Sequence, residues 1–127
     1  MHDAPSTAEL VESVKRFIDD IAAPQLTGHA AFHARVASNV LATVLRELDQ
    51  RPTAEAAEKE RLVALLDAGP DVSLDELNRA LCARISNGSV DLSTPGLLEH
   101  LKTTTIAQLS VDQPHYSGLA RALPPRG

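Results

Sequence analysis

The sequence predicts an all-α protein, built as a single-domain antiparallel bundle of about five helices with an extended C-terminal arm. Apolar residues recur with helical spacing in several segments, and no segment alternates as a half-buried strand would. Two segments follow a Ser-x-x-Glu helix-start signal, STAE at residues 6–9 and SLDE at residues 73–76. The connections between the helical segments are short, as they are in antiparallel bundles.

The 127 residues are expected to form one domain, with a core over about residues 6–112 and a tail, 113–127, that is extended or partly disordered. A net charge of −5 and only three aromatic residues argue against binding to nucleic acid. The single cysteine, the lack of a signal-like N-terminus and the lack of a long apolar run predict a cytoplasmic protein without a membrane span.

Two helices are expected in the first half of the chain. The first covers about residues 6–21 and carries the apolar stripe Leu10, Val14, Phe17, Ile18 and Ile21. Its opposite face holds two charge pairs, Glu12–Arg16 and Lys15–Asp19. The second helix, about residues 29–49, is expected to be the central element, with a buried stripe formed by Val36, Ala37, Val40, Leu41, Val44 and Leu48.

Three shorter helices are expected after a break at RPT, residues 51–53. The third, residues 54–66, is expected to bury only its second half, through Leu62, Val63, Leu65 and Leu66. The fourth has the stripe Leu74, Leu77, Leu81 and Ile85 and ends at Asn87–Gly88. The fifth starts with Thr94 as cap and Pro95 at the first position, and its apolar face is Leu97, Leu98, Leu101, Thr105, Ile106 and Leu109.

Histidine and cysteine side chains are the first candidates for chemistry. His29 and His33 have the i, i+4 spacing that lets two imidazoles share a metal ion, but no further ligand stands nearby in the sequence. We therefore expect no metal site and a half-buried His33. His100 is expected to be exposed opposite the leucines of its helix, and Cys82 to be a small core residue without a nearby base.

Polar residues on the second helix leave two interpretations open. Arg35, Asn39 and Arg46 lie opposite the aliphatic stripe, along with the small residues Ala34, Ser38 and Ala42. This side is either solvated, or covered by another helix or a second protein. The lone tyrosine, Tyr116, is expected to anchor the C-terminal arm on its own bundle or on another subunit.

Known signatures of enzymes are missing from the sequence. It contains no glycine-rich phosphate loop, no GxSxG, no CxxC and no Asp-rich metal loop. We therefore expect no catalytic residue and no cofactor.

Three stretches resemble a known family: ELVESVKRFI, AFHARVASNVLATVLREL and HLKTTTIAQLSVDQPHYSG. The family comprises small bacterial proteins catalogued as a domain of unknown function, and the resemblance covers about residues 3–118. Their genes commonly lie beside an aminoglycoside-phosphotransferase-like kinase and an acyl-CoA dehydrogenase. The resemblance therefore implies an accessory subunit of a kinase that acts on hydroxyacyl-CoA, such as 4-hydroxyacyl-CoA, in acid catabolism.

The same resemblance implies which residues contact a partner. The candidates are His33, Arg35, Asn39, Asp112, Pro114 and Tyr116. The expected partner is the kinase, with the acyl-CoA dehydrogenase as a second candidate. An alternative function is a bundle that binds a small molecule, an acyl-CoA or a nucleotide, in a pocket near His33, Asn39 and Tyr116. A structural homodimer is a third interpretation.

Overall fold

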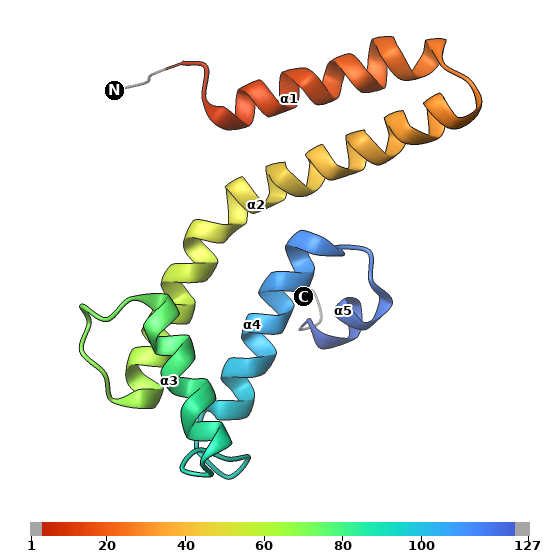
Figure 1. Cartoon of the computed structure of the whole chain (residues 1–127). Helices are drawn as coiled ribbons and strands as arrows, with labels where there is room; N and C mark the ends of the chain where they lie inside the picture. The colour runs from red at the N-terminus through yellow and green to blue at the C-terminus, as the bar shows by residue number, and fades with distance from the viewer. Residues whose placement is uncertain (1–3, 124–127) are drawn as a thin grey trace. The chain divides into compact units, whose positions relative to one another are not determined.

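The computed structural model describes residues 4–123 and contains, in that range, helices and no strand, which confirms the all-α class. The main helices are α1 Thr7–Phe17, α2 Gly28–Leu66, α3 Leu74–Ser86, α4 Leu97–Asp112 and α5 Ser117–Ala122 (Figure 1). The chain divides into two compact units between Arg51 and Pro52. We call them unit 1, before this boundary, and unit 2, after it. A single domain over the whole chain stays a prediction.

Unit 1 is a helical hairpin made of α1 and the first half of α2 (Figure 1). The Ser6 hydroxyl caps α1 by accepting a hydrogen bond from the Glu9 amide at 3.1 Å, as the STAE signal predicts. After Phe17 the helix widens into a π-helical turn, Ile18–Ala22, and then tightens into a 3₁₀ turn, Ala23–Gln25. Gly28, with a φ of +60°, follows this reversal and starts α2.

A polar contact lies between the two helices of the hairpin, among small and aliphatic side chains. Ser38 is the only buried residue in the described part of unit 1. Its hydroxyl donates to Asp19 Oδ1 at 2.5 Å, and Asp19 also pairs with Lys15 Nζ at 2.7 Å. The hydrogen bond with Asp19 raises the pKa of Lys15, while hydrogen bonds from Lys15 and Ser38 lower the pKa of Asp19. The small-residue side of α2 is therefore covered by a helix of the same chain.

The aliphatic stripes of unit 1 do not form the core that their periodicity predicts. Leu10, Val14, Phe17 and Ile21 are each more than half exposed, and Val36, Val40 and Leu48 are 41–56% exposed. Ile18, Ala37, Leu41 and Val44 are only partly covered. The predicted buried stripe of residues 36–48 is therefore wrong, because α1 packs on the adjacent side of α2, where Ala34, Ser38 and Ala42 let a helix approach.

The predicted break at residues 51–53 is also wrong, because α2 continues through Pro52 as one helix of 39 residues. A proline inside a helix removes one backbone hydrogen bond and costs about 3 kcal/mol. The residues that follow are rich in alanine and glutamate, which favour helix strongly. On the preceding turn, Arg51 pairs with Glu47 at 2.6 Å, which adds further local support.

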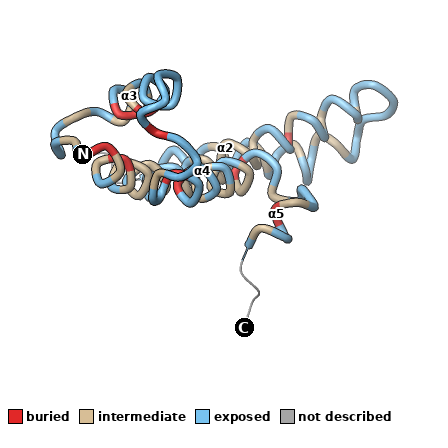
Figure 2. The backbone as a smooth tube through the Cα atoms, turned by 90° about the horizontal axis from the view of Figure 1, so that it is seen from below, coloured by how far each residue is buried: buried red, intermediate tan, exposed pale blue. Residues whose placement is uncertain are grey.

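Unit 2 has a leucine core, formed by the second half of α2 together with α3, the following loop and α4. The buried residues are Leu62, Leu66, Leu77, Leu81, Val90 and Leu97, and Val63, Leu65 and Leu74 pack against them. Figure 2 shows most of the buried segments, in red, in these elements, with others in α5 and in the first half of α2. The predicted cores of residues 62–66 and 74–81 are therefore confirmed, whereas Ile85 is 42% exposed.

Caps and turns delimit the helices of unit 2. Asp67 takes a left-handed conformation (φ +51°) at the end of α2, and the Ala68 amide donates back to the Val63 carbonyl at 3.0 Å. Ser73 and Glu76 form the predicted capping box at the start of α3. Gly88, at φ +82°, supplies the left-handed residue after α3.

Helix α4 starts at Leu97 and not at Pro95, so the predicted cap is wrong. The Thr94 hydroxyl accepts a hydrogen bond from the Asp91 amide at 2.9 Å, and this closes a turn before the helix. Ser93 donates to Asp91 through its hydroxyl and its amide, and both bonds lower the pKa of Asp91. Gly96, at φ +88°, becomes the residue that precedes the first helical turn.

The tail also differs from the extended arm that was expected. Residues 117–122 form the short helix α5, and Leu119 is buried with 5% of its surface exposed. α5 lies close to α4, to which it is joined by a turn at residues 113–116 (Figure 1). Burial of Leu119 explains why this segment folds. Residues 124–127 of the predicted tail lie outside the described residues.

Candidate functional site

The hairpin of unit 1 has one polar side and one apolar side. In α1 and the π-helical turn that follows it, the row Val11, Lys15 and Ile18 is partly covered, as expected of residues that face α2. In α2, the corresponding row includes Ala34, Ser38 and Leu45. Each residue of a helix is rotated by about 100° from the one before it. Because the two helices are antiparallel, residues that immediately precede these rows share one side of the hairpin, and those that immediately follow share the other.

The side that precedes the contact rows is apolar. It comprises Leu10, Val14 and Phe17 of α1 and His33, Ala37, Leu41 and Val44 of α2. His33, at one end, is the only ionisable group in this set. Ile21 and Leu48, exposed by 53% and 41%, extend the surface along the two helices. We call the residues Leu10, Val14, Phe17, Ile21, Ala37, Leu41, Val44 and Leu48 the hairpin apolar side.

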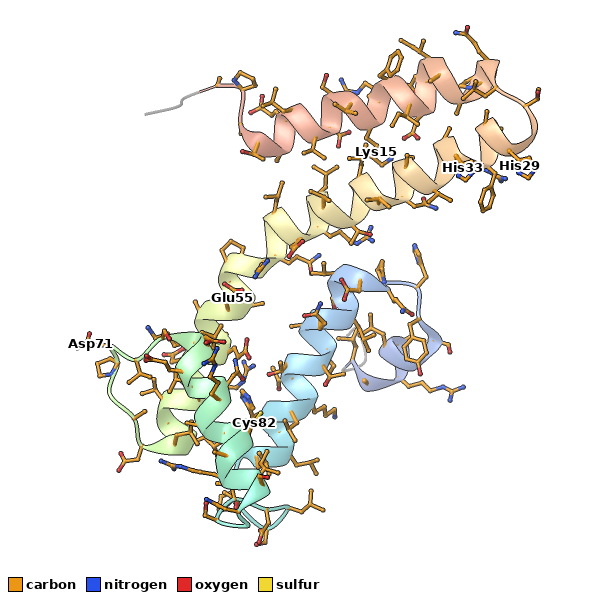
Figure 3. All side chains as sticks on the ribbon, in the orientation of Figure 1. Lys15, His29, His33, Glu55, Asp71 and Cys82 are labelled. Atoms are coloured by element: carbon orange, nitrogen blue, oxygen red, sulfur yellow. The ribbon has the colours of Figure 1, made fainter. Side chains whose placement is uncertain are left out.

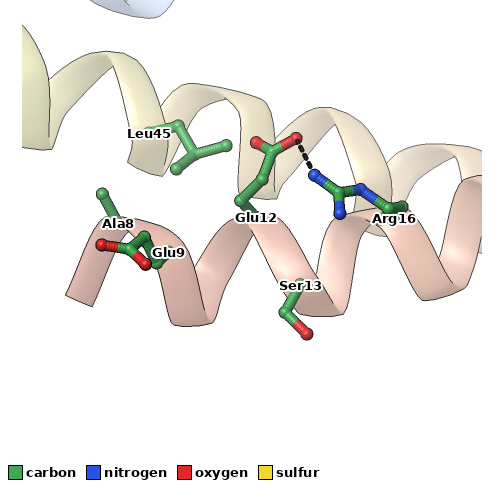
Figure 4. A pocket seen from close by; sticks show the side chains of 6 residues that line it. All are labelled: Ala8, Glu9, Glu12, Ser13, Arg16 and Leu45. Atoms are coloured by element: carbon green, nitrogen blue, oxygen red, sulfur yellow. Dashed lines mark ion pairs between the residues drawn. The ribbon is translucent and has the colours of Figure 1, made fainter. Parts of the chain in front are cut away.

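The opposite side of the hairpin is polar. Glu12 and Arg16 of α1 form an ion pair at 3.8 Å that crosses a shallow pocket of about 420 Å³ (Figure 4). Leu45 of α2 lines the same pocket. Three residues of α2 follow its contact row on this side, namely Arg35, Asn39 and Arg46. The surface carries both charge signs, so it suits a polar partner surface more than an apolar ligand.

Arg35, Asn39 and Arg46 differ in how far they are covered. Arg35 and Asn39 are exposed, and Arg46 is partly covered and donates from Nη2 to the Thr43 hydroxyl at 3.0 Å. Thr43 in turn donates to the Asn39 carbonyl one turn earlier. Of the two interpretations left open, cover by another helix holds for the small residue Ser38, and solvation holds for Arg35 and Asn39.

The two histidines of α2 lie near its start, as Figure 3 shows, and both are exposed. The half-buried position expected of His33 is wrong, because the nearest residues of α1 on its side, Val14 and Phe17, are more than half exposed and no other described element of unit 1 covers this end of the hairpin. Its ring meets Phe32 edge to face, with centroids 5.6 Å apart. Over residues 4–123, no group of three histidine, cysteine or acidic side chains could hold a metal ion.

The C-terminal candidates form a compact turn in unit 2. The Tyr116 amide donates to the Gln113 carbonyl, and the Leu119 amide donates to the Tyr116 carbonyl, both at 3.0 Å. The tyrosine ring lies over Gly118, where an added Cβ would come within 2.5 Å of Tyr116 Cε1. Tyr116 is nevertheless 51% exposed, so it presents a fixed aromatic surface. The residue that anchors this segment on its own unit is Leu119.

Asp112 precedes this turn, and Pro114 lies within it. The Asp112 carboxylate accepts a hydrogen bond from Gln108 Nε2 at 2.7 Å and is exposed, and Pro114 is partly covered. Three of the six predicted partner residues are therefore neighbours in unit 2, and His33, Arg35 and Asn39 lie in unit 1. None of the residues named for the alternative small-molecule pocket lines either of the two pockets described in this section.

Sequence reasoning missed a polar cluster inside unit 2. His100 was expected to be exposed, yet only 3% of its surface is accessible. Arg61 Nε donates to His100 Nδ1 at 3.2 Å, and Arg61 Nη2 donates to the Thr104 hydroxyl at 3.1 Å. Burial, reinforced by the Arg61 charge, lowers the pKa of His100. The imidazole is therefore held in its neutral form.

The same cluster explains an error in the predicted face of α4. Leu97, His100, Thr104 and Val111 face the unit, and Leu98 and Leu101 are 63% and 40% exposed. The i, i+3, i+7 spacing of the first three residues is the signal that could have located them. Arg61 and His100 also line an open pocket of about 330 Å³ with Leu65, Pro95 and Glu99.

Cys82 was predicted to be a core residue, and this is wrong. It is exposed on α3, where Figure 3 labels it. The buried row of this helix is Leu77 and Leu81, and Cys82 lies one residue past it.

The fold and these surfaces define a class: an all-helical protein whose candidate sites are exposed helix faces and a turn. A family model described as Domain of unknown function (DUF6285) matches residues 24–116. The chain therefore belongs to this family. No curated protein matches the chain, and no solved structure matches it. In the part of the chain that is described, no helix has the length and apolar character needed to cross a membrane.

Proposed function

We propose that this chain is a non-catalytic accessory subunit that binds and supports a phosphotransferase-fold kinase acting on hydroxyacyl-CoA in acid catabolism. The kinase and its substrate class come from the family resemblance of three stretches of the sequence. The single structural observation that supports partner binding is the exposed Tyr116 ring, held in place by its own turn.

A fixed aromatic side chain suits a binding surface for a physical reason. Tyrosine brings a large contact area with few rotatable bonds, so little conformational entropy is lost when a partner covers it. Here two backbone hydrogen bonds hold the main chain of Tyr116, and its ring lies against Gly118. Residues of this kind often dominate the free energy of an interface.

The first experiment is co-expression of the chain with an aminoglycoside-phosphotransferase-like kinase of the proposed class, followed by size-exclusion chromatography and a kinase assay. A common elution peak and higher kinase activity with the chain than without it are the expected results. Separate elution, with unchanged kinase activity in the absence of the chain, would contradict the proposal.

Variants of the turn sharpen this test. Tyr116→Ala is expected to weaken kinase binding by about 10–100-fold, the range typical of a dominant interface residue. His115→Ala, on the neighbouring exposed residue, is the matched control and should retain affinity. If His115→Ala weakened kinase binding as much as Tyr116→Ala, binding would depend on the fold of the turn and not on the Tyr116 ring.

Gly118→Ala tests the fixed position of the ring without removing it. The added methyl group displaces Tyr116, so binding should weaken although the tyrosine remains. Tyr116 is the only tyrosine in a chain without tryptophan, so its fluorescence reports the displacement directly. Normal kinase affinity together with an altered tyrosine signal would show that the ring position does not matter.

A further inference from the structure

We propose that the hairpin apolar side binds the same surface of a second copy of this chain, so that two hairpins form a four-helix bundle. This inference is independent of the kinase, because it concerns what completes unit 1. Its starting point is that Ser38 is the only buried residue in the described part of unit 1.

A hairpin without buried apolar side chains lacks the main source of folding free energy. Two helices joined by a short reversal are stable only when their apolar faces are covered. In unit 2 five leucines are buried at 0–4% exposure, namely Leu62, Leu66, Leu77, Leu81 and Leu97, whereas in unit 1 Leu10, Val14 and Phe17 of α1 are exposed by 52–54%. The missing contacts of unit 1 are therefore of the kind that a helical partner supplies.

The chemistry of the surface fits a second copy. Leu10, Val14 and Phe17 on α1 and Leu41 and Val44 on α2 are on the same side of the hairpin, and none of them is charged. The ion pairs Glu12–Arg16 and Lys15–Asp19 lie outside this set. The same surface on two copies can therefore meet, as in an isologous interface, without burying an unpaired charge from these residues.

The area reaches the size of a specific interface when the whole surface is covered. Five of its eight residues are 41–54% exposed and the other three are partly covered, so the hairpin apolar side offers at most about 600 Å² per copy, and a dimer would bury at most about 1,200 Å², the lower bound of a specific interface. The surface extends along both antiparallel helices. Two hairpins that pack through this surface bring four helices together, which is the arrangement of a four-helix bundle.

The experiment measures the mass of the full chain by light scattering and sedimentation, from about 1 µM to about 200 µM. The expected result is a dimer with twice the 13.6 kDa of the chain, which dissociates on dilution. A monomer at every concentration would overturn the proposal.

Charge variants identify the surface that pairs. Val14→Glu and Phe17→Glu should each raise the dissociation constant of the dimer by at least about 100-fold, because each would bury an unpaired carboxylate. Ser13→Glu is the matched control, since it adds the same charge to the polar side of the same helix, and it should leave the dimer intact. Circular dichroism checks that each variant keeps its helix content.

Other results of these variants distinguish the second copy from other partners of the hairpin apolar side. A dimer that persists in both Val14→Glu and Phe17→Glu would place the interface elsewhere and overturn the proposal. A monomer whose kinase binding is lost in Val14→Glu would assign the surface to the kinase, which overturns the second copy while supporting the proposed function. A dimer that does not bind the kinase would support the pairing of two copies and overturn the proposed function.

Discussion

Units 1 and 2 are both built from helices that carry rows of apolar residues. Unit 2 buries such rows between its own helices, whereas unit 1 leaves much of its apolar surface exposed. In unit 2, leucines of α2, α3 and α4 meet, and Leu62 and Leu77 are almost completely buried. In unit 1, the rows that meet include Lys15 and Ser38, which both bond to Asp19. Leu10, Val14 and Phe17 of α1 stay more than half exposed. The comparison teaches that helical periodicity identifies a surface that needs cover, without saying whether the cover comes from the same chain.

The largest effect is expected in the core of unit 2. Leu62→Ala should lower the free energy of unfolding by about 2–5 kcal/mol, because it removes a fully buried side chain and leaves a cavity. Chemical denaturation followed by circular dichroism measures it. Leu98→Ala, at a residue 63% exposed, is the control and should change the free energy by about 0.5 kcal/mol or less. Equal losses in the two variants would contradict the assignment of the core.

A smaller effect is expected where the hairpin helices meet. Ser38→Leu places a large side chain in the contact between α1 and α2, and overpacking of this kind costs about 1–3 kcal/mol. Faster amide hydrogen exchange in Thr7–Phe17 would report the loss. Val40→Leu enlarges a side chain that is 56% exposed, so it should leave exchange unchanged. If Val40→Leu were the more harmful variant, the contact faces of the hairpin would be reversed.

The smallest effect is a pH dependence in unit 2. Burial lowers the pKa of His100 in the folded state, so the unfolded state binds its proton first as the pH falls. The contribution of neutral His100 to stability is therefore fully present above a pH of about 6.5 and is lost as the pH falls through the folded pKa. His100→Gln keeps an acceptor for Arg61 without titrating, so the pH dependence of unfolding below 6.5 should become shallower. An unchanged slope would contradict a buried, neutral imidazole.

The sequence was a good guide to helix type and to the core of unit 2. The apolar rows of residues 62–66 and 74–81 have several helical neighbours to pack against, so periodicity and burial coincide there. It failed at Pro52, because a local rule about proline was outweighed by the strong helix formers on its C-terminal side. It failed at Thr94 for a similar reason, since Asp91 and Thr94 bond to each other in a turn before the helix.

For the candidate site, the sequence left open whether Arg35 and Asn39 are covered and predicted Tyr116 as an anchor, and in the structure all three are exposed, while their contact with a partner stays a prediction. It could not place them, because which side of α2 receives α1 depends on tertiary packing and not on local spacing. His100 was missed because a histidine opposite several leucines was taken to face solvent. The bond from Arg61, 39 positions earlier in the chain, is the contact that buries it, and no local pattern carries that information.

Pro52 has a consequence for how the molecule opens. It has no amide hydrogen, so the ladder of helix α2 lacks the bond to the Leu48 carbonyl at the boundary between the two units. Because one hydrogen bond is already missing here, loss of helical structure on one side of Pro52 is less strongly coupled to the other side. Amides before residue 48 and after residue 56 should then exchange with deuterium as two separate populations, although one unbroken helix contains them both.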